Sequence, residues 1–374
     1  MNGMASMERD KTYFSENLLN WYRKSRRDLP WRRSRDPYHI WVSEIMLQQT
    51  RVDTVIPYFN RFVDRFPSLR DLAVAPEEDV LKHWEGLGYY SRARNLQSAA
   101  REVVEKYGGV VPRDKKEVSG LKGVGPYTTG AILSIAYDQP EPAVDGNVMR
   151  VLSRYFCLEE DIARPATRIG MEALAQSLIP ENEAADFNQA LMELGALVCT
   201  PKSPSCGECP VGERCSGRLA GRERELPVKT KAKKAKPVFL FAAVVQGTGE
   251  HAGKVLVRQR PDSGLLAKMW ELPYVEAPDE EAWGSAARGA SLLEAGLAEE
   301  GIGVRASGIV AGEAQHVFTH LVWRLKVLEA VAVDEKYVSD RTGYRWVGPD
   351  DFENYSWPNV FRKWLTEYFI QSLS

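Results

Sequence analysis

The sequence of 374 residues has no long hydrophobic segment, either at its start or later. The first residues, MNGMASMERDK, lack the apolar stretch of a secretion signal, and the longest uninterrupted apolar run, VFLFAAVV at 238–245, is too short to span a bilayer. These absences argue against secretion and against a membrane partner. We therefore expect a soluble protein of the cytoplasm.

Cysteine is scarce, with five residues in the whole chain, and disulfides are improbable without a secretion signal. Four of the five fall within CTPKSPSCGECPVGERC, as Cys199, Cys206, Cys209 and Cys215. Four thiolates from one short loop can hold either a tetrahedral zinc ion or a 4Fe-4S cluster, and the spacing alone does not decide between them. The remaining one, Cys157, is expected to be a buried apolar residue.

A large excess of one charge is also missing, since the net charge is only -2. The two halves differ, however: residues 1–237 carry 36 basic and 32 acidic side chains, whereas residues 238–374 carry 13 and 19. The segment WYRKSRRDLPWRRSR (21–35) holds seven basic residues and one acidic residue, interleaved with aromatic ones. Such a mixture suits phosphate and base contacts, although a solvated basic helix face fits it equally well.

The segment RERELPVKTKAKKAKP (222–237) is too charged to bury a core and is predicted to be an extended linker. Before it, FSENLLNWY, PYFNRFVDRF, EEDVLKHW, ARNLQSAAREVVEKY and TTGAILSIAY show helical spacing of apolar residues. After it, VFLFAAVVQ, GKVLVRQR and HLVWRLKVLEAV are typical of strands. We expect an all-α domain over 1–221 and an α+β domain over 238–374, without internal repeats.

The stretch LKGVGPYTT combines two glycines with a helix start near Pro126. A Cβ at Gly123 or Gly125 is expected to obstruct the turn, and the N–H groups at the helix start could bind a DNA phosphate. Such turns are common, so this signal alone is weak. Asp145, in AVDGNVMR, follows twenty residues after Gly125. Taken alone, it is most simply a helix N-cap.

Together, LKGVGPYT, VDGNVMR and the cysteine loop resemble the helix-hairpin-helix superfamily of DNA glycosylases, which carries a 4Fe-4S cluster. WVSEIMLQQTRV, WEGLGYYSRARNL, FNQALMELGALVC and the C-terminal domain resemble, more closely, the MutY family of adenine DNA glycosylases. The resemblance implies a six-helix barrel with the hairpin, a cluster domain and an active site in the cleft between them. It further implies a monomer that binds double-stranded DNA and removes adenine mispaired with 8-oxoguanine or guanine, in a bacterial, nucleoid-associated setting.

Base removal of this kind requires two carboxyl groups in opposite protonation states. Glu44 lies among apolar residues in IWVSEIMLQ, where desolvation should raise its pKa, so it is the candidate acid that protonates the adenine. Asp145 is the candidate carboxylate that stabilises the sugar cation, with Asn147 as its hydrogen-bonding partner. A buried ion pair is the alternative explanation of Glu44.

Tyr127 occupies the hairpin position at which the resemblance implies a Schiff-base lysine in bifunctional relatives. A phenol cannot form a Schiff base, so we predict base removal without strand cleavage. Two alternatives remain at this point: a bifunctional pyrimidine glycosylase and lyase, and a cluster-bearing protein that binds damaged DNA without catalysis.

The resemblance also implies residues that contact DNA. Trp31 and Arg32 should border the adenine pocket, Gln49 and Tyr89 should enter the base stack, and Gln189 should face the adenine edge. Further contacts are expected at Thr50, Leu87, Lys122, Gly123, Val124 and Gly125.

The C-terminal domain resembles the Nudix-related 8-oxoguanine reader of that family. A Nudix hydrolase needs R-E-x-x-E-E-x-G, whereas EAGLAEEGI (294–302) places Ala295 and Ala298 at two of the three glutamates, so metal binding and hydrolysis should be lost. The candidate reading loop is VFTHL, with Phe318, Thr319 and His320. Thr319 replaces the usual serine, which keeps the hydroxyl but adds a methyl group.

Overall fold

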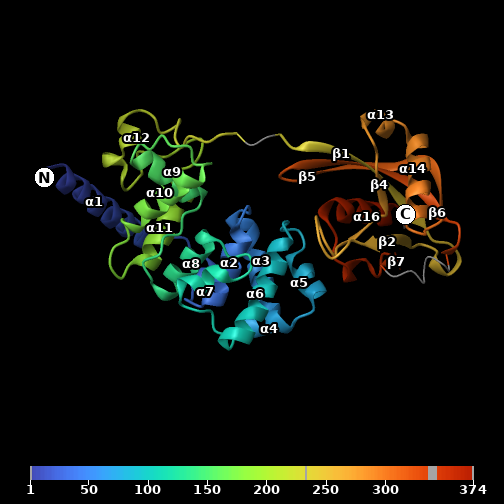
Figure 1. Cartoon of the computed structure of the whole chain (residues 1–374), viewed down its shortest axis with the longest axis horizontal. Helices are drawn as coiled ribbons and strands as arrows, with labels where there is room; N and C mark the ends of the chain where they lie inside the picture. Colours follow the sequence, from blue (N-terminus) through green and yellow to red (C-terminus); the bar gives the residue numbers. More distant parts are fainter. Residues whose placement is uncertain (1, 232–233, 336–342, 373–374) are drawn as a thin grey trace. The chain divides into compact units, whose positions relative to one another are not determined.

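The computed structural model describes residues 2–231, 234–335 and 343–372, without the side chains of 2–9 and 372. The chain divides into two compact units (Figure 1). The first contains the residues up to Ala75 together with Arg92–Lys231, and the second contains Pro76–Ser91 together with Ala232–Ser374. Among the described residues, no helix combines the length and the apolar character needed to cross a membrane.

The first unit is helical, as the sequence predicts. Its helices are α1 (Asn2–Ser25), α2 (Pro37–Leu47), α3 (Val52–Arg65), α4 (Leu69–Val74), α6 (Ser91–Tyr107), α7 (Lys115–Gly120), α8 (Pro126–Tyr137), α9 (Gly146–Tyr155), α10 (Pro165–Gln176), α11 (Ala184–Leu197) and α12 (Ser216–Leu219), with short 3-10 turns η1 (Pro30–Arg32) and η2 (Gly212–Arg214).

Apolar spacing and capping residues explain these helices. In α3, Val55, Phe59 and Phe62 recur every three or four residues and are all buried. Asp114 accepts hydrogen bonds from the first N–H groups of α7, and Asp145 does the same for α9. A shared core of α1, α9, α10 and α11 then holds the residues around Asp145 in place.

The second unit contains a mixed sheet, several helices and one helix from the middle of the chain. That helix is α5 (Glu77–Trp84). The other elements are β1 (Lys236–Gln246), η3 (Gly249–His251), β2 (Val255–Gln259), β3 (Trp270–Glu271), β4 (Tyr274–Glu276), α13 (Glu280–Trp283), α14 (Ala286–Glu299), β5 (Val304–Val317), β6 (Leu321–Ala332), β7 (Tyr344–Val347), η4 (Phe352–Asn354) and α16 (Asn359–Ser372).

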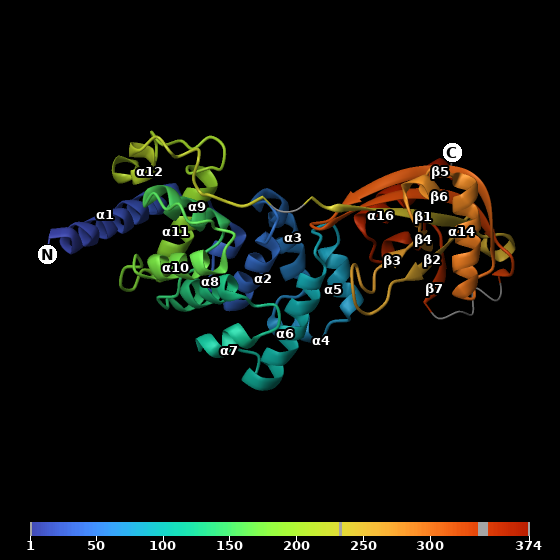
Figure 2. The ribbon, with the colours of Figure 1, turned by 45° about the horizontal axis from the view of Figure 1, so that its top comes forward.

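The sheet has the order β3-β2-β1-β6-β5, with β4 also paired to β1 and β7 to β2. β1 and β6 run parallel, with Leu240 opposite Leu325. Successive β1 residues alternate between two cores, one shared with α16 and the other with α14, so the two helices cover opposite faces (Figure 2). Burial on both faces explains why β1 reads as a continuous apolar run instead of an alternating one.

The basic segment predicted as a linker is attached at both ends. Leu226 is buried, and its carbonyl accepts a hydrogen bond from Arg154 at 2.9 Å. Lys236 already pairs with Leu321 in the sheet. Residues 232–233 lie outside the described residues, and the boundaries at 222 and 237 stay a prediction.

Candidate functional site

A cavity of about 830 Å³ in the helical unit collects most of the predicted catalytic and DNA-contacting residues. Its walls come from η1, the C-terminal half of α2, the turn before α8, the start of α9 and one face of α11. The predicted residues that line it are Trp31, Arg32, Glu44, Gln49, Thr50, Gly123, Gly125, Tyr127, Asp145, Asn147 and Gln189.

Glu44 lies on the α2 wall and is only 5% exposed. Burial raises its pKa to about 7, a hydrogen bond donated by the Tyr127 hydroxyl to Oε2 opposes this rise, and the nearby charge of Asp145 adds to it. The Tyr127 phenol has a pKa well above its usual 10, chiefly because it is buried and faces Glu44, so it acts as a neutral donor. The structure thus confirms that desolvation raises the pKa of Glu44.

Asp145 caps α9, as the simplest explanation of an isolated aspartate predicted, yet it also faces the cavity. Its carboxylate accepts hydrogen bonds from Val148 N at 2.7 Å and from Asn147 Nδ2 at 2.8 Å. Burial raises its pKa above 3.8, whereas these hydrogen bonds counteract the rise. A single carboxyl group can therefore serve both as a cap and as a charge directed at a ligand.

Arg150 fixes Asn147 in turn. Its Nη2 donates to Asn147 Oδ1 at 2.8 Å, and its Nε donates to the carbonyl of Cys199 at 2.8 Å. A continuous path of hydrogen bonds consequently joins Asp145 to the first cysteine of the cysteine loop. Arg150 was not predicted from the sequence, although its position three residues after Asn147 in one helix was a usable signal.

The α11 wall of the cavity carries a buried ion cluster that was not predicted from the sequence. The Glu193 side chain is 1% exposed and accepts from Arg27 at 2.7 Å and from Arg32 at 2.9 Å. Burial raises the pKa of Glu193, but the hydrogen bonds from Arg27 and Arg32 outweigh it and lower that pKa to about 2. Glu193 lies four residues after Gln189 in α11, a spacing that places both on one helix face.

Three glycines set close approaches around the cavity. A Cβ at Gly130 of α8 would lie 2.0 Å from the carbonyl oxygen of Pro142, and one at Gly195 of α11 would lie 2.6 Å from Asn147 Cβ. Gly123 has φ of +79°, and a Cβ there would meet Asn95. The prediction that a Cβ would also obstruct Gly125 is wrong, because Gly125 has φ of -94° and open space beside it.

The hairpin residues divide between surface and core. Lys122 and Gly125 are exposed, which leaves them accessible to a phosphate, whereas Val124 is 7% exposed and packs inward. Gln49, at the cavity rim, has φ of +62°, a left-handed conformation that costs a non-glycine residue free energy. The left-handed residue directly follows the C-cap of α2, and the DNA-contacting role of Gln49 stays a prediction.

The second unit brings the other predicted DNA contacts together. Thr319 and His320 are exposed at the β5–β6 turn, while Phe318 packs edge-on against His316 and Trp323. The Tyr89 hydroxyl lies 2.8 Å from the hydroxyl of Thr319. Tyr89 is 51% exposed and also has a left-handed φ of +48°. Leu87 is 7% exposed in this structure.

The segment matched to the Nudix motif lies in α14 and the turn after it. Ala295 and Ala298 are exposed there. Glu294 accepts a hydrogen bond from the N–H of Ala306, and Glu300 is engaged by Arg258 and Tyr344. Glu299, which retains the third glutamate position of the motif, is exposed, and the loss of hydrolysis stays a prediction.

The cysteine loop surrounds a small cavity lined by the four thiols and Arg154. Arg154 is 2% exposed and its Nη1 lies 3.3 Å from Cys199 Sγ. Backbone N–H groups point at two of the sulfurs, from Val211 to Cys209 and from Gly217 and Arg218 to Cys215. Clustered thiolates with such donors fit an iron-sulfur centre. Cys157 is half-buried, contrary to the prediction of a buried residue.

Comparison with known proteins agrees with this geometry. Residues 42–181 match the family model described as HhH-GPD superfamily base excision DNA repair protein, residues 199–215 match the iron-sulfur binding domain of endonuclease III, and residues 244–367 match a NUDIX domain. The adenine DNA glycosylase of Rattus norvegicus is 38% identical over 96% of this chain and 78% of its own length. The chain belongs to the adenine DNA glycosylase family.

Other relatives support the same family. The adenine DNA glycosylase of Homo sapiens is 35% identical over 96% of this chain and 74% of its own length. The helical part is also similar to the structure of a thermostable thymine-DNA glycosylase, with a TM-score of 0.53 and 32% identity over 57% of this chain and 99% of that chain. This family member is therefore a DNA-binding glycosylase of base excision repair, and its cofactor is a 4Fe-4S cluster.

Proposed function

We propose that this adenine DNA glycosylase removes adenine paired with 8-oxoguanine, and less efficiently adenine paired with guanine, and that it leaves the DNA strand intact. The observation that supports this proposal most directly is that Glu44 and Asp145 line the same cavity. The Tyr127 phenol lines it too, and the charges of both carboxyl groups raise its pKa. The cavity is accessible only to a base that has left the helical stack, which requires base flipping.

Glu44 acts as the general acid in this proposal. Its pKa of about 7 keeps a large fraction protonated near neutral pH, which is the condition for efficient proton donation. Because Oε2 accepts the hydrogen bond from Tyr127, the proton that Glu44 donates resides on Oε1. Protonation of the adenine ring turns it into a better leaving group, and the N-glycosidic bond then breaks.

Asp145 stabilises the positive charge that develops on the sugar as this bond breaks. The Asn147 amide and the Val148 N–H bind the carboxylate and hold it in one orientation before the substrate arrives. Water completes the reaction, since Tyr127 offers a hydroxyl and no amine at the hairpin position where a Schiff base would form. Trp31 and Gln189 line the space available to the adenine.

The cysteines Cys199, Cys206, Cys209 and Cys215 are the proposed ligands of the 4Fe-4S cluster. When bound, the cluster ties the loop together by four iron–sulfur bonds. The chain's own contribution is the arginine pair: Arg154 binds the loop at Cys199 Sγ, and Arg150 binds the carbonyl of the same residue.

The reading of the opposite base is assigned to Phe318, Thr319 and His320, with Tyr89 beside Thr319.

The proposed function is tested by single-turnover excision of adenine opposite 8-oxoguanine and opposite guanine in otherwise identical duplexes. We expect faster excision opposite 8-oxoguanine, an intact strand with an abasic site, and no covalent adduct after borohydride treatment. Equal rates on both duplexes would remove the 8-oxoguanine assignment, and a high-yield adduct would remove the strand-intact assignment.

The reading loop is tested by Thr319→Ala combined with His320→Ala. A lost base contact is worth ~1 to 3 kcal/mol of discrimination, so the preference for 8-oxoguanine should fall by that amount while excision opposite guanine changes little. An equal loss on both duplexes would assign the loop to general binding or stability instead.

A further inference from the structure

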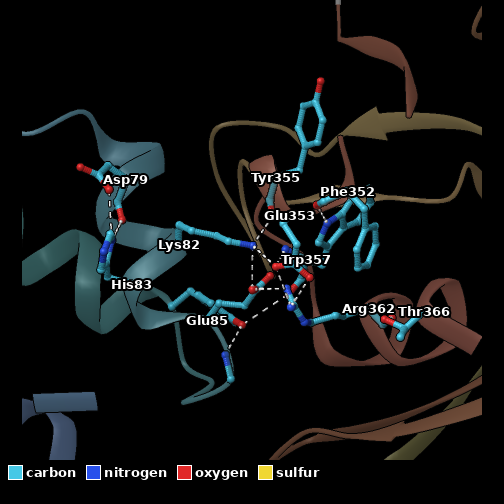
Figure 3. Close-up of polar contacts among 12 residues, drawn as sticks. Asp79, Lys82, His83, Glu85, Phe352, Glu353, Tyr355, Trp357, Arg362 and Thr366 are labelled. Carbon is cyan, nitrogen blue, oxygen red and sulfur yellow. Dashed lines mark hydrogen bonds and ion pairs between the residues drawn. The ribbon is translucent and has the colours of Figure 1, made fainter. Parts of the chain in front are cut away.

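The helix α5 and the loop after it belong to the second compact unit, although the chain on both sides of them, up to Ala75 and from Arg92, belongs to the helical unit. The family model for the glycosylase region, 42–181, includes this segment. A stretch of the glycosylase sequence is thus packed with the C-terminal sheet region. Figure 3 shows the polar contacts that hold it there.

Glu85 is the centre of these contacts. Its side chain is 8% exposed, and its carboxylate accepts hydrogen bonds from the backbone N–H of Trp357 at 2.7 Å and from the guanidinium of Arg362 (Figure 3). Lys82, one turn earlier, is 3.1 Å from Glu85 and also donates to the carbonyl of Tyr355 at 3.1 Å. Two of these donors, the Trp357 N–H and Arg362, come from the C-terminal part of the chain, so the carboxylate attaches α5 to it with a defined geometry.

Arg362 completes the attachment from the other side. It lies on α16, where its Nη2 donates to both oxygens of Glu353 at 2.7 and 2.9 Å while its Nη1 binds Glu85. Arg362 therefore bridges the C-terminal unit's own carboxylate and one supplied by the middle of the chain. A lysine could supply the charge at this position but not the two-pronged geometry.

The loop that follows Glu85 is held by hydrogen bonds within it and to Trp357. The Tyr90 hydroxyl accepts from Gly86 N at 3.1 Å and donates to the carbonyl of Trp357 at 3.5 Å, and Trp84 Nε1 donates to Gly88 O at 3.2 Å. Tyr89, between these fixed points, is exposed and hydrogen-bonded to Thr319. Tyr89 thus lies in a loop whose two ends, at Glu85 and Tyr90, are hydrogen-bonded to the C-terminal part of the chain.

We propose that Glu85 and Arg362 are positioning residues for recognition of the base opposite the adenine: their ion pair fixes the Tyr89 loop against the C-terminal unit, so that Tyr89 and Thr319 present one continuous contact surface. The specificity part of this proposal rests on the proposed preference for 8-oxoguanine. The attachment of the loop does not, and the two parts are measured separately.

The attachment is tested by hydrogen exchange of the full-length holoprotein without DNA, followed in peptides that cover residues 76–91. Arg362→Gln should speed exchange in these peptides, and Arg362→Lys should speed it less. Lys363→Gln is the matched control, because it removes a cation from the adjacent, exposed position of the same helix and should leave exchange unchanged. Unaltered exchange in Arg362→Gln would overturn the proposal, whatever the substrate preference is.

The specificity part is tested by the ratio of single-turnover rates opposite 8-oxoguanine and guanine. Arg362→Gln should lower this ratio by about tenfold, the scale of one lost base contact, with partial rescue in Arg362→Lys. When Arg362→Gln is combined with Thr319→Ala, the ratio should fall little below that of Thr319→Ala alone, because both changes disturb the contact between Tyr89 and Thr319. Equal rate losses on the two duplexes, or fully additive effects in the double variant, would overturn the positioning role.

If the unaltered protein excises adenine equally from both duplexes, the 8-oxoguanine assignment fails, while the exchange experiment still decides the attachment. Glu85→Gln provides a second route, since it removes the charge from the other side of the pair and retains a carbonyl acceptor for the Trp357 N–H. It should reproduce the exchange and ratio changes of Arg362→Gln, and failure to do so contradicts the pairing.

Discussion

Two buried glutamates line the cavity, and their pKa values are shifted in opposite directions. Glu44 on α2 is 5% exposed and has a pKa of about 7, whereas Glu193 on α11 is even more buried and has a pKa of about 2. Glu44 accepts a hydrogen bond from one neutral phenol, whereas Glu193 forms ion pairs with two guanidinium groups. Burial alone therefore does not determine protonation; the charge of the partner decides whether the cost of desolvation is relieved by a proton or by an ion pair.

Because the two glutamates have different partners, the same change to glutamine should slow excision at Glu44 and lower the free energy of unfolding at Glu193. Glu44→Gln should reduce adenine excision by about 10²- to 10⁴-fold, the usual contribution of a general acid, because the glutamine amide is not acidic enough to transfer a proton. Single-turnover rates measure this change. DNA affinity and the free energy of unfolding should stay close to those of the unaltered protein, since glutamine resembles a neutral acid. Excision at a near-normal rate would mean that Glu44 is not the acid.

Glu193→Gln should instead destabilise the protein, by about 3 kcal/mol at pH 7, because it leaves Arg27 and Arg32 without their buried counter-charge. Urea unfolding measures the difference. The folded-state pKa of Glu193 is below its unfolded value, so the stability it provides is complete above about pH 4.5 and declines as the pH falls toward 2. The gap between variant and unaltered protein should therefore narrow in acid; a constant gap contradicts the ion-pair explanation.

Tyr127→Phe removes the neutral hydrogen-bonding partner of Glu44. The Tyr127 hydrogen bond lowers the pKa of Glu44, so its removal should raise that pKa further above about 7. The acid form then persists to higher pH, and the fall in excision rate on the alkaline side should move upward by about one pH unit or less. Tyr137→Phe is the control, since its hydroxyl binds the carbonyl of Val111 at the other end of α8. A shift toward lower pH contradicts this assignment.

The smallest effect is expected for Glu183→Gln. Glu183 also pairs with an arginine, Arg23, at 2.6 Å, but the two side chains are 34% and 45% exposed. Solvent screens such pairs, so the change in the free energy of unfolding should be below ~1 kcal/mol. A loss as large as that of Glu193→Gln would show that burial is not what separates the two ion pairs.

Much of the fold was predictable because local patterns produced it. Apolar spacing placed the helices, the continuous run at 238–245 marked the central strand, and the cysteine spacing marked the cluster loop. The surroundings of Glu44 in the sequence were enough to predict a raised pKa, because apolar neighbours in one helix accompany burial.

The remaining features depend on contacts between segments far apart in the chain. The spacing of α5 shows that one of its faces is buried, but not that α16 supplies the partner of Glu85 more than 270 residues later. The ion pairs of Glu193 could not be predicted from the sequence either, because its partners lie 161 and 166 residues away. The roles of the DNA-contacting residues stay predictions that the proposed experiments test.

The discontinuous second unit limits how this enzyme can be taken apart. Trp84, Leu87 and Tyr90 come from the glycosylase half of the gene and are buried within the unit that the C-terminal half builds. Truncation after Lys231 would remove Trp357 and Arg362, the hydrogen-bonding partners of Tyr90 and Glu85, so slower excision by a shortened enzyme would not by itself report base reading. The two halves are consequently not exchangeable modules: a C-terminal half transplanted from a relative must bring a compatible 76–91 segment with it.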